Sequence, residues 1–124
     1  MSVSAHSWTT APGEQLAEGI VRKGFRGSRI MLVQNILDPG SPEIPLHSHE
    51  NEQLSICVSG RMTLWIEEVE YDMGPGTLIK IPTNAKHRGQ QYGDEPCHII
   101  DVFDPIREDY RHLVAYQDAD FADA

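Results

Sequence analysis

Turn-forming residues divide most of this chain into short runs, with Gly, Pro, Asn or Asp recurring about every eight to twelve residues. The runs between them are β-prone, and short, evenly spaced strands are typical of antiparallel sandwiches and barrels. We therefore predict an all-β fold. The expected strands are residues 19–25, 29–37, 53–60, 61–67, 69–74, 77–82, 87–92 and 97–103.

The segment IREDYRHLVAY, near the end of the chain, departs from this pattern because its apolar residues recur at helical spacing. Four of them would lie on one face: Ile106, Tyr110, Leu113 and Val114. We expect a short C-terminal helix over about residues 105–117, after a barrel over about residues 15–104. The acidic tail and the first dozen residues, apart from Trp8, contain few packing residues, so we expect both ends to be loosely attached.

The length and charge of the chain narrow its possible partners. Its 124 residues suffice for one domain with a hydrophobic core, and we identify no linker within 1–124. The 19 acidic and 10 basic side chains give a formal charge of −9, which disfavours nucleic acid and anionic membranes because both are polyanions. A small anionic ligand remains compatible, since it needs only one or two local cations.

The sequence also carries expectations about location and redox state. No apolar run approaches the roughly 20 residues of a membrane span, and the first residues lack the apolar core of a signal peptide. We therefore expect a cytoplasmic protein with no membrane partner. In that setting Cys57 and Cys97 are expected to be reduced and packed, rather than joined in a disulfide.

The segment PLHSHENEQ, residues 45–53, places two histidines one residue apart. Alternate residues of a strand point to the same face, so His47 and His49 would project together, and Gln53 would join them if ENE forms a turn. A third histidine, His87, opens a later predicted strand. Three neutral imidazoles and one oxygen ligand suit a single divalent ion of Ni, Fe, Mn, Zn or Co. Alternatively, the histidine pair lies in a solvated loop, because so short a pattern also occurs by chance.

The surroundings of these histidines resemble the two sequence motifs of the cupin family. The stretch from Gly40, GSPEIPLHSHENEQLSICVSG, is similar to the first motif, and residues 76–91, GTLIKIPTNAKHRGQQ, to the second. The resemblance implies a single-domain cupin with a double-stranded β-helix, or jelly-roll barrel. Asn84 stands where the second motif usually has glycine, and asparagine also tolerates left-handed backbone angles. Gln53 stands where the first motif usually has a glutamate ligand.

Gln53 changes the chemistry expected of a metal at this site. A neutral amide oxygen donates less charge than a carboxylate, so the ion keeps a net charge nearer +2 and is a stronger Lewis acid. Such an ion is better suited to polarising a carbonyl, hydroxyl or carboxylate of an anionic ligand than to stabilising high-valent iron. The alternative is that Gln53 lies behind the ligands or marks a degraded site.

The segment IIDVFDPIREDY, residues 99–110, contains the candidates for chemistry beside the metal. If Ile99 faces the barrel, Asp101 does too, and a carboxylate there can act as a general base or acid. Alternatively, Asp101 is a buried acid that orients a metal-binding histidine. The histidine pair with glutamine, the late histidine and the ending DVFxPxRED together resemble the KdgF-type cupins of pectin and alginate breakdown. Those proteins hasten the conversion of 4,5-unsaturated monouronates into linear ketouronates.

This second resemblance implies roles residue by residue. The positions that match the metal ligands are His47, His49, Gln53 and His87. Asp101 and Phe103 match active-site positions. Arg107, in the matching RED, could bind the substrate carboxylate as a bidentate donor, or instead form a surface salt bridge with Glu108 or Asp109. Further cations that could guide a carboxylate, or simply line solvated strand edges, are Arg22, Lys23, Arg26 and Arg29.

Three functions are consistent with these features. The first is a metal-dependent lyase or isomerase that tautomerises or ring-opens a small carboxylate-bearing sugar or keto acid, with Asp101 moving the proton. The second is a metal-dependent dioxygenase that uses the same ligands. The third is a non-enzymatic cupin that binds a small molecule.

The aliphatic faces of two predicted strands suggest a partner subunit. Trp65 shares one strand face with Thr63, and the other face of that strand is aliphatic. One of these faces must lie outward, as must the aliphatic face of residues 54–58 if Gln53 points inward. We expect a homodimer on this basis, with plain core packing as the competing account.

Overall fold

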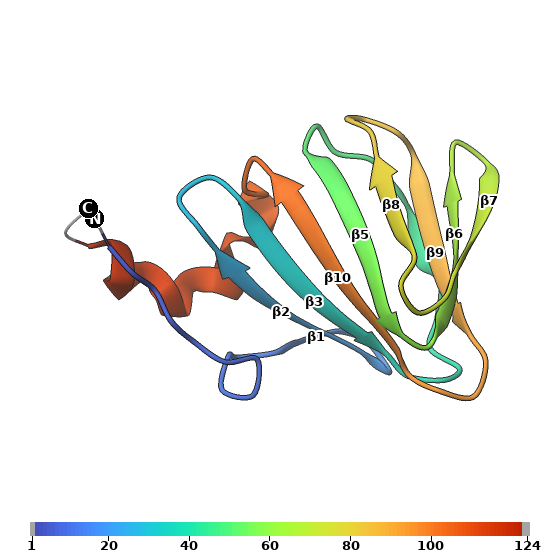
Figure 1. The fold of residues 1–124 in the computed structure, drawn as a ribbon, viewed down its shortest axis with the longest axis horizontal. Helices are drawn as coiled ribbons and strands as arrows, with labels where there is room; N and C mark the ends of the chain where they lie inside the picture. The colour runs from blue at the N-terminus through green and yellow to red at the C-terminus, as the bar shows by residue number, and fades with distance from the viewer. Residues whose placement is uncertain (1, 123–124) are drawn as a thin grey trace.

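The computed structural model describes residues 2–122, in which ten strands are followed by one 3₁₀ helix (Figure 1). The helix, η1, spans Glu108–Phe121. The strands are β1 Glu14–Ala17, β2 Ile20–Arg26, β3 Met31–Leu37, β4 Ile44–His47, β5 Glu52–Ser59, β6 Arg61–Ile66, β7 Val69–Met73, β8 Leu78–Ile81, β9 His87–Tyr92 and β10 Cys97–Asp104.

The strands form two antiparallel sheets, as predicted for a jelly-roll barrel. One sheet has six strands in the order β1-β2-β3-β10-β5-β8, and the other has four in the order β4-β9-β6-β7. Strands distant in sequence lie side by side: β10 pairs with both β3 and β5. All eight expected strands are present. The structure adds β1 and β4, which are short and were not among them.

The barrel interior is filled by residues of alternating parity, because neighbouring side chains of a strand point to opposite faces. Met62, Leu64 and Ile66 of β6 are buried in the main core cluster. Trp65 therefore points away from that core, and the guanidinium of Arg88 lies 3.8 Å from its ring centroid. The buried core also contains Ile20, Leu37, Cys57, Met73, Ile81, Ala85, Cys97 and Ile99.

Helix η1 packs against β2 and a second core cluster. Its Leu113 and Val114 are buried together with Met31, Val33, Phe103 and Ile106. The expected helix over 105–117 is thus present but displaced, beginning at Glu108 and ending at Phe121, and its geometry is 3₁₀. Close packing requires a glycine at position 24, because a Cβ there would lie 2.9 Å from a methyl group of Val114.

The two ends of the described chain hold each other, so the expectation that both are loosely attached is wrong over these residues. The side chain of Gln117 is fully buried. Its oxygen accepts a hydrogen bond of 2.8 Å from the backbone N–H of Arg26, and its NH₂ group donates one of 3.0 Å to the backbone carbonyl of Arg26. Asp120 contacts Ser4 and lies 2.7 Å from Nε2 of His6. Polar side chains, rather than apolar packing alone, fix these ends. Residues 123–124 of the tail lie outside the described residues.

Two further expectations concern the cysteines and the membrane. Cys57 and Cys97 are both buried and free, as predicted. Across residues 2–122, we find no helix with the length and apolar character needed to cross a membrane.

Candidate metal centre

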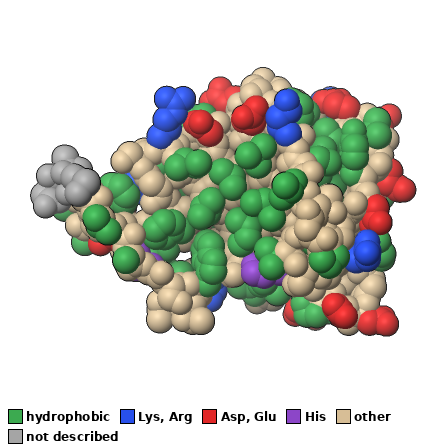
Figure 2. All heavy atoms as spheres, viewed as in Figure 1, with side chains coloured by type: hydrophobic (Ala, Val, Ile, Leu, Met, Phe, Trp, Pro, Cys, Tyr) green, Lys and Arg blue, Asp and Glu red, His purple; other side chains and the backbone are tan. Residues whose placement is uncertain are grey.

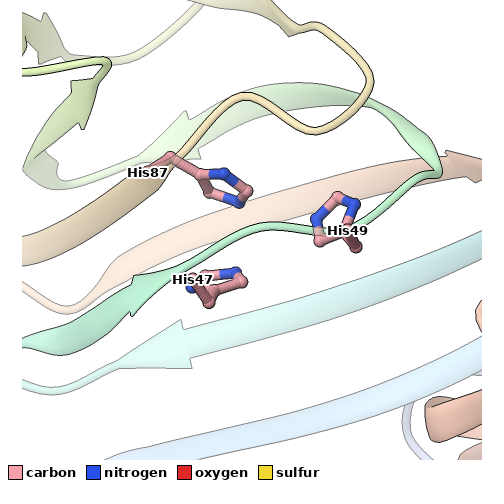
Figure 3. Close-up of side chains that lie close together, drawn as sticks. All are labelled: His47, His49 and His87. Carbon is pink, nitrogen blue, oxygen red and sulfur yellow. The ribbon is translucent and has the colours of Figure 1, made fainter.

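Three histidines from two segments of the chain converge inside the fold (Figure 3). His47 ends β4 and pairs in register with His87, which begins β9. His49 follows two residues after His47, in the loop before β5. Ligand nitrogens of the three rings all lie within 4.8 Å of one another, so the group could hold one ion. The predicted convergence of the histidines is therefore present.

Backbone carbonyls fix the orientation of all three rings. Nδ1 of His47 lies 2.8 Å from the carbonyl oxygen of Pro45, Nδ1 of His49 lies 2.9 Å from that of Asn51, and Nδ1 of His87 lies 2.9 Å from that of Ala85. A carbonyl can only accept, so each Nδ1 carries a proton and Nε2 is the nitrogen of each ring that is left to bind a metal. This is the arrangement by which metal-binding histidines are held.

The protonation states also favour metal binding. Burial lowers the pKa of His87 to about 4. Burial also lowers the pKa of His49, and the positive charge of the nearby Arg107 guanidinium lowers it further. Both rings are consequently neutral near pH 7. The Nε2 atom of His87 is buried and has no hydrogen-bond partner among residues 2–122. A buried nitrogen lone pair without a partner is costly unless something binds it.

Gln53 supplies an oxygen to the same centre. Its Nε2 donates to Oδ1 of Asp101 at 2.9 Å and to Oγ of Ser55 at 3.2 Å, which leaves Oε1 on the other side, 3.1 Å from Nε2 of His49. Because Nδ1 of His49 carries the proton, this short contact joins two lone pairs. A cation between them would turn the contact from repulsive to attractive. The three histidines and Gln53 therefore fit one divalent transition ion.

Asp101 lies behind Gln53 and not against the histidines. It pairs with Ser55 across β5 and β10, and its carboxylate accepts hydrogen bonds from Ser55, Gln53 and, at 2.9 Å, Nδ2 of Asn35. Burial raises the pKa of Asp101, and these hydrogen bonds oppose the shift. One alternative from sequence was that Asp101 is a buried acid that orients a metal-binding histidine. Asp101 is buried, but the side chain that it orients is the amide of Gln53.

Phe103 and Arg107 extend the site towards η1. The Phe103 ring meets the His49 ring edge to face, with centroids 5.5 Å apart. The Arg107 guanidinium lies 5.1 Å from the Phe103 centroid and also pairs with Asp109, with Nη2 to Oδ2 at 2.6 Å. Only 8% of the Arg107 side chain is exposed. Of the two alternatives for Arg107, the salt bridge with Asp109 is present. The residue also lines the interior cavity, and its binding of a carboxylate stays a prediction.

An interior cavity of about 70 Å³ adjoins the histidines, Gln53 and Asp101. A volume of this size holds about five to seven water molecules, at about 10–15 Å³ each. Asn35 and Tyr110 also line it and were not identified from sequence. A usable signal existed for Asn35, because it is the one polar residue at an inward position of β3, between Val33 and Leu37. Nothing in the strand pattern indicated Tyr110, which reaches the cavity from η1.

Comparison with known proteins agrees with this architecture. The cupin domain model matches residues 35–103, which include both histidine segments, Gln53 and Asp101. The structure of KdgF from a Halomonas species is similar with a TM-score of 0.79 and 24% sequence identity, over 87% of this chain and 98% of that one. An RmlC-like cupin from Shewanella frigidimarina is similar with a TM-score of 0.77 and 25% identity, over 89% and 99% of the two chains.

A curated relative comes from Bacillus subtilis. The H2HPP isomerase of that organism is 30% identical over 77 residues, which are 62% of this chain and 32% of the relative. This chain thus corresponds to about a third of the relative's length.

These observations define a small-barrel protein with a three-histidine centre, and the chain belongs to the cupin family. Within that family it is a small cupin that resembles KdgF in fold.

Proposed function

We propose that this cupin is a metal-dependent enzyme that tautomerises or ring-opens a small carboxylate-bearing sugar or keto acid. The observation that carries the proposal is the adjacency of a histidine and amide donor set to a buried carboxylate, in a cavity that Arg107 also lines. Enzymes among the similar proteins, KdgF and an isomerase, support the same class of reaction.

In this scheme the four donor residues, His47, His49, Gln53 and His87, would hold a divalent ion that polarises a carbonyl or hydroxyl oxygen of the ligand. Gln53, being neutral, would leave that ion more electrophilic than glutamate would. Asp101 would accept a proton from a ligand hydroxyl and return it to a ligand carbon, so the composition of the ligand is unchanged. Its Oδ2 is available, because only Asn35 donates to that atom among residues 2–122.

The remaining residues would shape and neutralise the site. Phe103 forms an apolar wall beside His49, which limits water around the reacting atoms. Arg107 lies next to Phe103 and would hold the ligand carboxylate. Oxygen has no role in this reaction, which separates the proposal from a dioxygenase.

The test uses the full chain purified without added metal. Elemental analysis would identify the bound ion, and a 4,5-unsaturated monouronate would be the substrate, followed by loss of the absorbance of its double bond. We expect excess chelator to abolish turnover and one divalent ion to restore it. We also expect Asp101→Asn to lower kcat by at least about 100-fold while metal content stays unchanged. Turnover that survives complete metal removal would contradict the proposal.

Two other outcomes would assign the site differently. Oxygen consumption in step with substrate loss would indicate a dioxygenase. Thermal stabilisation by the uronate with no product by mass spectrometry would indicate a binding protein.

A further inference from the structure

Two buried arginines from opposite ends of the chain line the same interior cavity. Arg22 comes from β2 and Arg107 from the segment that enters η1. They are 9% and 7% exposed, respectively. Guanidinium groups stay charged when buried, so each needs an anion within reach. Of the four cations near the start of the chain that were considered from sequence, Arg22 is the one that lines this cavity. The other three contact groups elsewhere: Lys23 the carbonyl of Trp8, Arg26 the ring of Phe121, and Arg29 the carboxylate of Asp104.

Tyr110 supports both guanidinium groups. The Cζ atom of Arg107 lies 3.7 Å from its ring centroid and that of Arg22 lies 4.3 Å from it. Contacts this short with an aromatic face are attractive for a cation. The Tyr110 ring also meets the Phe103 ring edge to face, at 5.9 Å between centroids. Tyr110 therefore joins the arginine pair to the wall of the metal centre.

Each arginine is paired with an acid that lies nearer the surface. Nε and Nη2 of Arg22 both donate to Oε1 of Glu14, at 2.8 and 2.6 Å. Arg107 makes a bidentate pair with Asp109, at 3.1 and 2.6 Å. The side chains of Glu14 and Asp109 are 33% and 62% exposed, against 10% and 8% for the arginines. Among residues 2–122, Nη1 of neither arginine has a hydrogen-bond acceptor, so each retains donors for a further anion.

We propose that Arg22 and Arg107, supported by Tyr110, form an anion subsite that binds the ligand carboxylate and selects carboxylates over neutral analogues. The proposal deepens the proposed function and rests on it for the class of ligand. Two planar guanidinium forks match a planar carboxylate. The subsite keeps Glu14 and Asp109 as internal counter-ions, whose negative charge weakens its affinity for an incoming carboxylate.

The test measures binding of D-galacturonate, of its uncharged methyl ester and of inorganic phosphate to the full chain by calorimetry. We expect galacturonate to bind at least about tenfold more tightly than the ester. Arg22→Gln should remove most of this preference, while Arg22→Lys should retain part of it because the charge remains. Arg29→Gln is the matched control, since Arg29 is an exposed cation paired with Asp104, and it should leave both affinities unchanged.

Two further variants test the platform and the counter-ions. Tyr110→Phe keeps the ring and should preserve the preference, whereas Tyr110→Leu should reduce it. Glu14→Gln removes a competing charge and should tighten galacturonate binding several-fold. Melting temperatures and metal content identify any variant that does not fold. If Arg22→Gln does not fold, the role of Arg22 is decided by whether Glu14→Gln binds galacturonate more tightly than the unaltered chain does.

The outcomes separate this inference from the proposed function. Equal affinity for galacturonate and its ester, tighter binding of phosphate than galacturonate, or an unchanged preference in Arg22→Gln would overturn the subsite. If galacturonate binds in an Arg22-dependent way but no unsaturated uronate is converted, the subsite stands and the proposed reaction fails. If turnover is present and KM does not change in Arg22→Gln, the reaction stands and the subsite fails.

Discussion

At the scale of single residues, the ring of His87 shows how folding prepares a metal ligand. It is only 3% exposed, its Nδ1 is held by a backbone carbonyl, and its Nε2 has no partner among residues 2–122. A ring held in this way is neutral and points its lone pair into the histidine group. Burial disfavours the charged form of this ring, which lowers its pKa to about 4 in the folded chain.

This pKa predicts the pH dependence of stability in the metal-free protein. The unfolded chain binds a proton at this ring near pH 6.5, whereas the folded chain does so only near pH 4, so the unfolded state binds more protons between these values. Lowering the pH from 7 to 5 should therefore reduce the free energy of unfolding by up to about 2 kcal/mol through this residue. Urea denaturation of chelator-treated protein measures the effect. His87→Asn removes the titrating group, and an identical pH slope in that variant would contradict the prediction.

The identity of Gln53 shows what residue type alone can and cannot indicate. Its spacing from the histidine pair marked it as a ligand candidate, and strand parity placed it on the inward face, where it is 6% exposed. Which amide atom faces the histidines could not be predicted. That depends on Asp101, 48 residues later in the chain, which accepts the amide N–H and turns the oxygen to the opposite side.

At the scale of secondary-structure elements, β-strands were more predictable than the helix. The strands can be predicted from turn-forming residues and from the alternation of side chains between two faces, because both patterns involve residues that are consecutive in the chain. Helix η1 depends on packing against β2: its helical spacing was visible, but its 3₁₀ geometry and its extension to Phe121 were not. Gln117 and Asp120 fix the extension through hydrogen bonds to residues about ninety or more positions away.

The contact between η1 and β2 predicts a specific stability effect. Gly24 lies under Val114 and Leu113, where an added Cβ would approach within 2.9 and 3.0 Å. Both neighbours are buried, so Gly24→Ala should displace η1 and lower the free energy of unfolding by about 1–3 kcal/mol. The urea midpoint gives the measurement.

Gly13→Ala is the matched control for Gly24→Ala. Its Cβ would meet only the side chains of Val21 and Lys23, at 3.2 Å or more, and Val21 and Lys23 are not fully buried. We expect this control to change the free energy of unfolding by less than Gly24→Ala does. Equal effects of the two substitutions would show that the close approach of η1 is not the cause.

At the scale of the whole molecule, apolar side chains gather on the outward face of the six-stranded sheet (Figure 2). Cross-strand rows explain the patch: Leu32, Val102 and Leu54 are register partners across β3, β10 and β5. Leu54 is 44% exposed, and Val58 and Leu78 on the same face are 48% and 72% exposed. Contiguous apolar surface of this kind often marks an interface.

We propose that a second copy of the chain covers this face, in line with the homodimer expected from sequence. Analytical ultracentrifugation should show a dimer at micromolar concentration, and Leu54→Glu combined with Val58→Glu should give a monomer with an unchanged far-ultraviolet circular dichroism spectrum. Val69→Glu is the control, because Val69 is similarly exposed but lies on β7 of the other sheet. A wild-type chain that sediments as a monomer throughout would refute the dimer.

The sequence by itself determined the strand pattern, the inward parity of the site residues and the pairing of His47 with His49, because each of these depends on residues close together in the chain. Only the tertiary structure decided which distant strands become neighbours. The insertion of β10 between β3 and β5 brings Asp101 to Asn35 and Gln53. The docking of η1 brings Tyr110 and Arg107 to Arg22. Such contacts depend on closure of the whole barrel, and no local pattern encodes them.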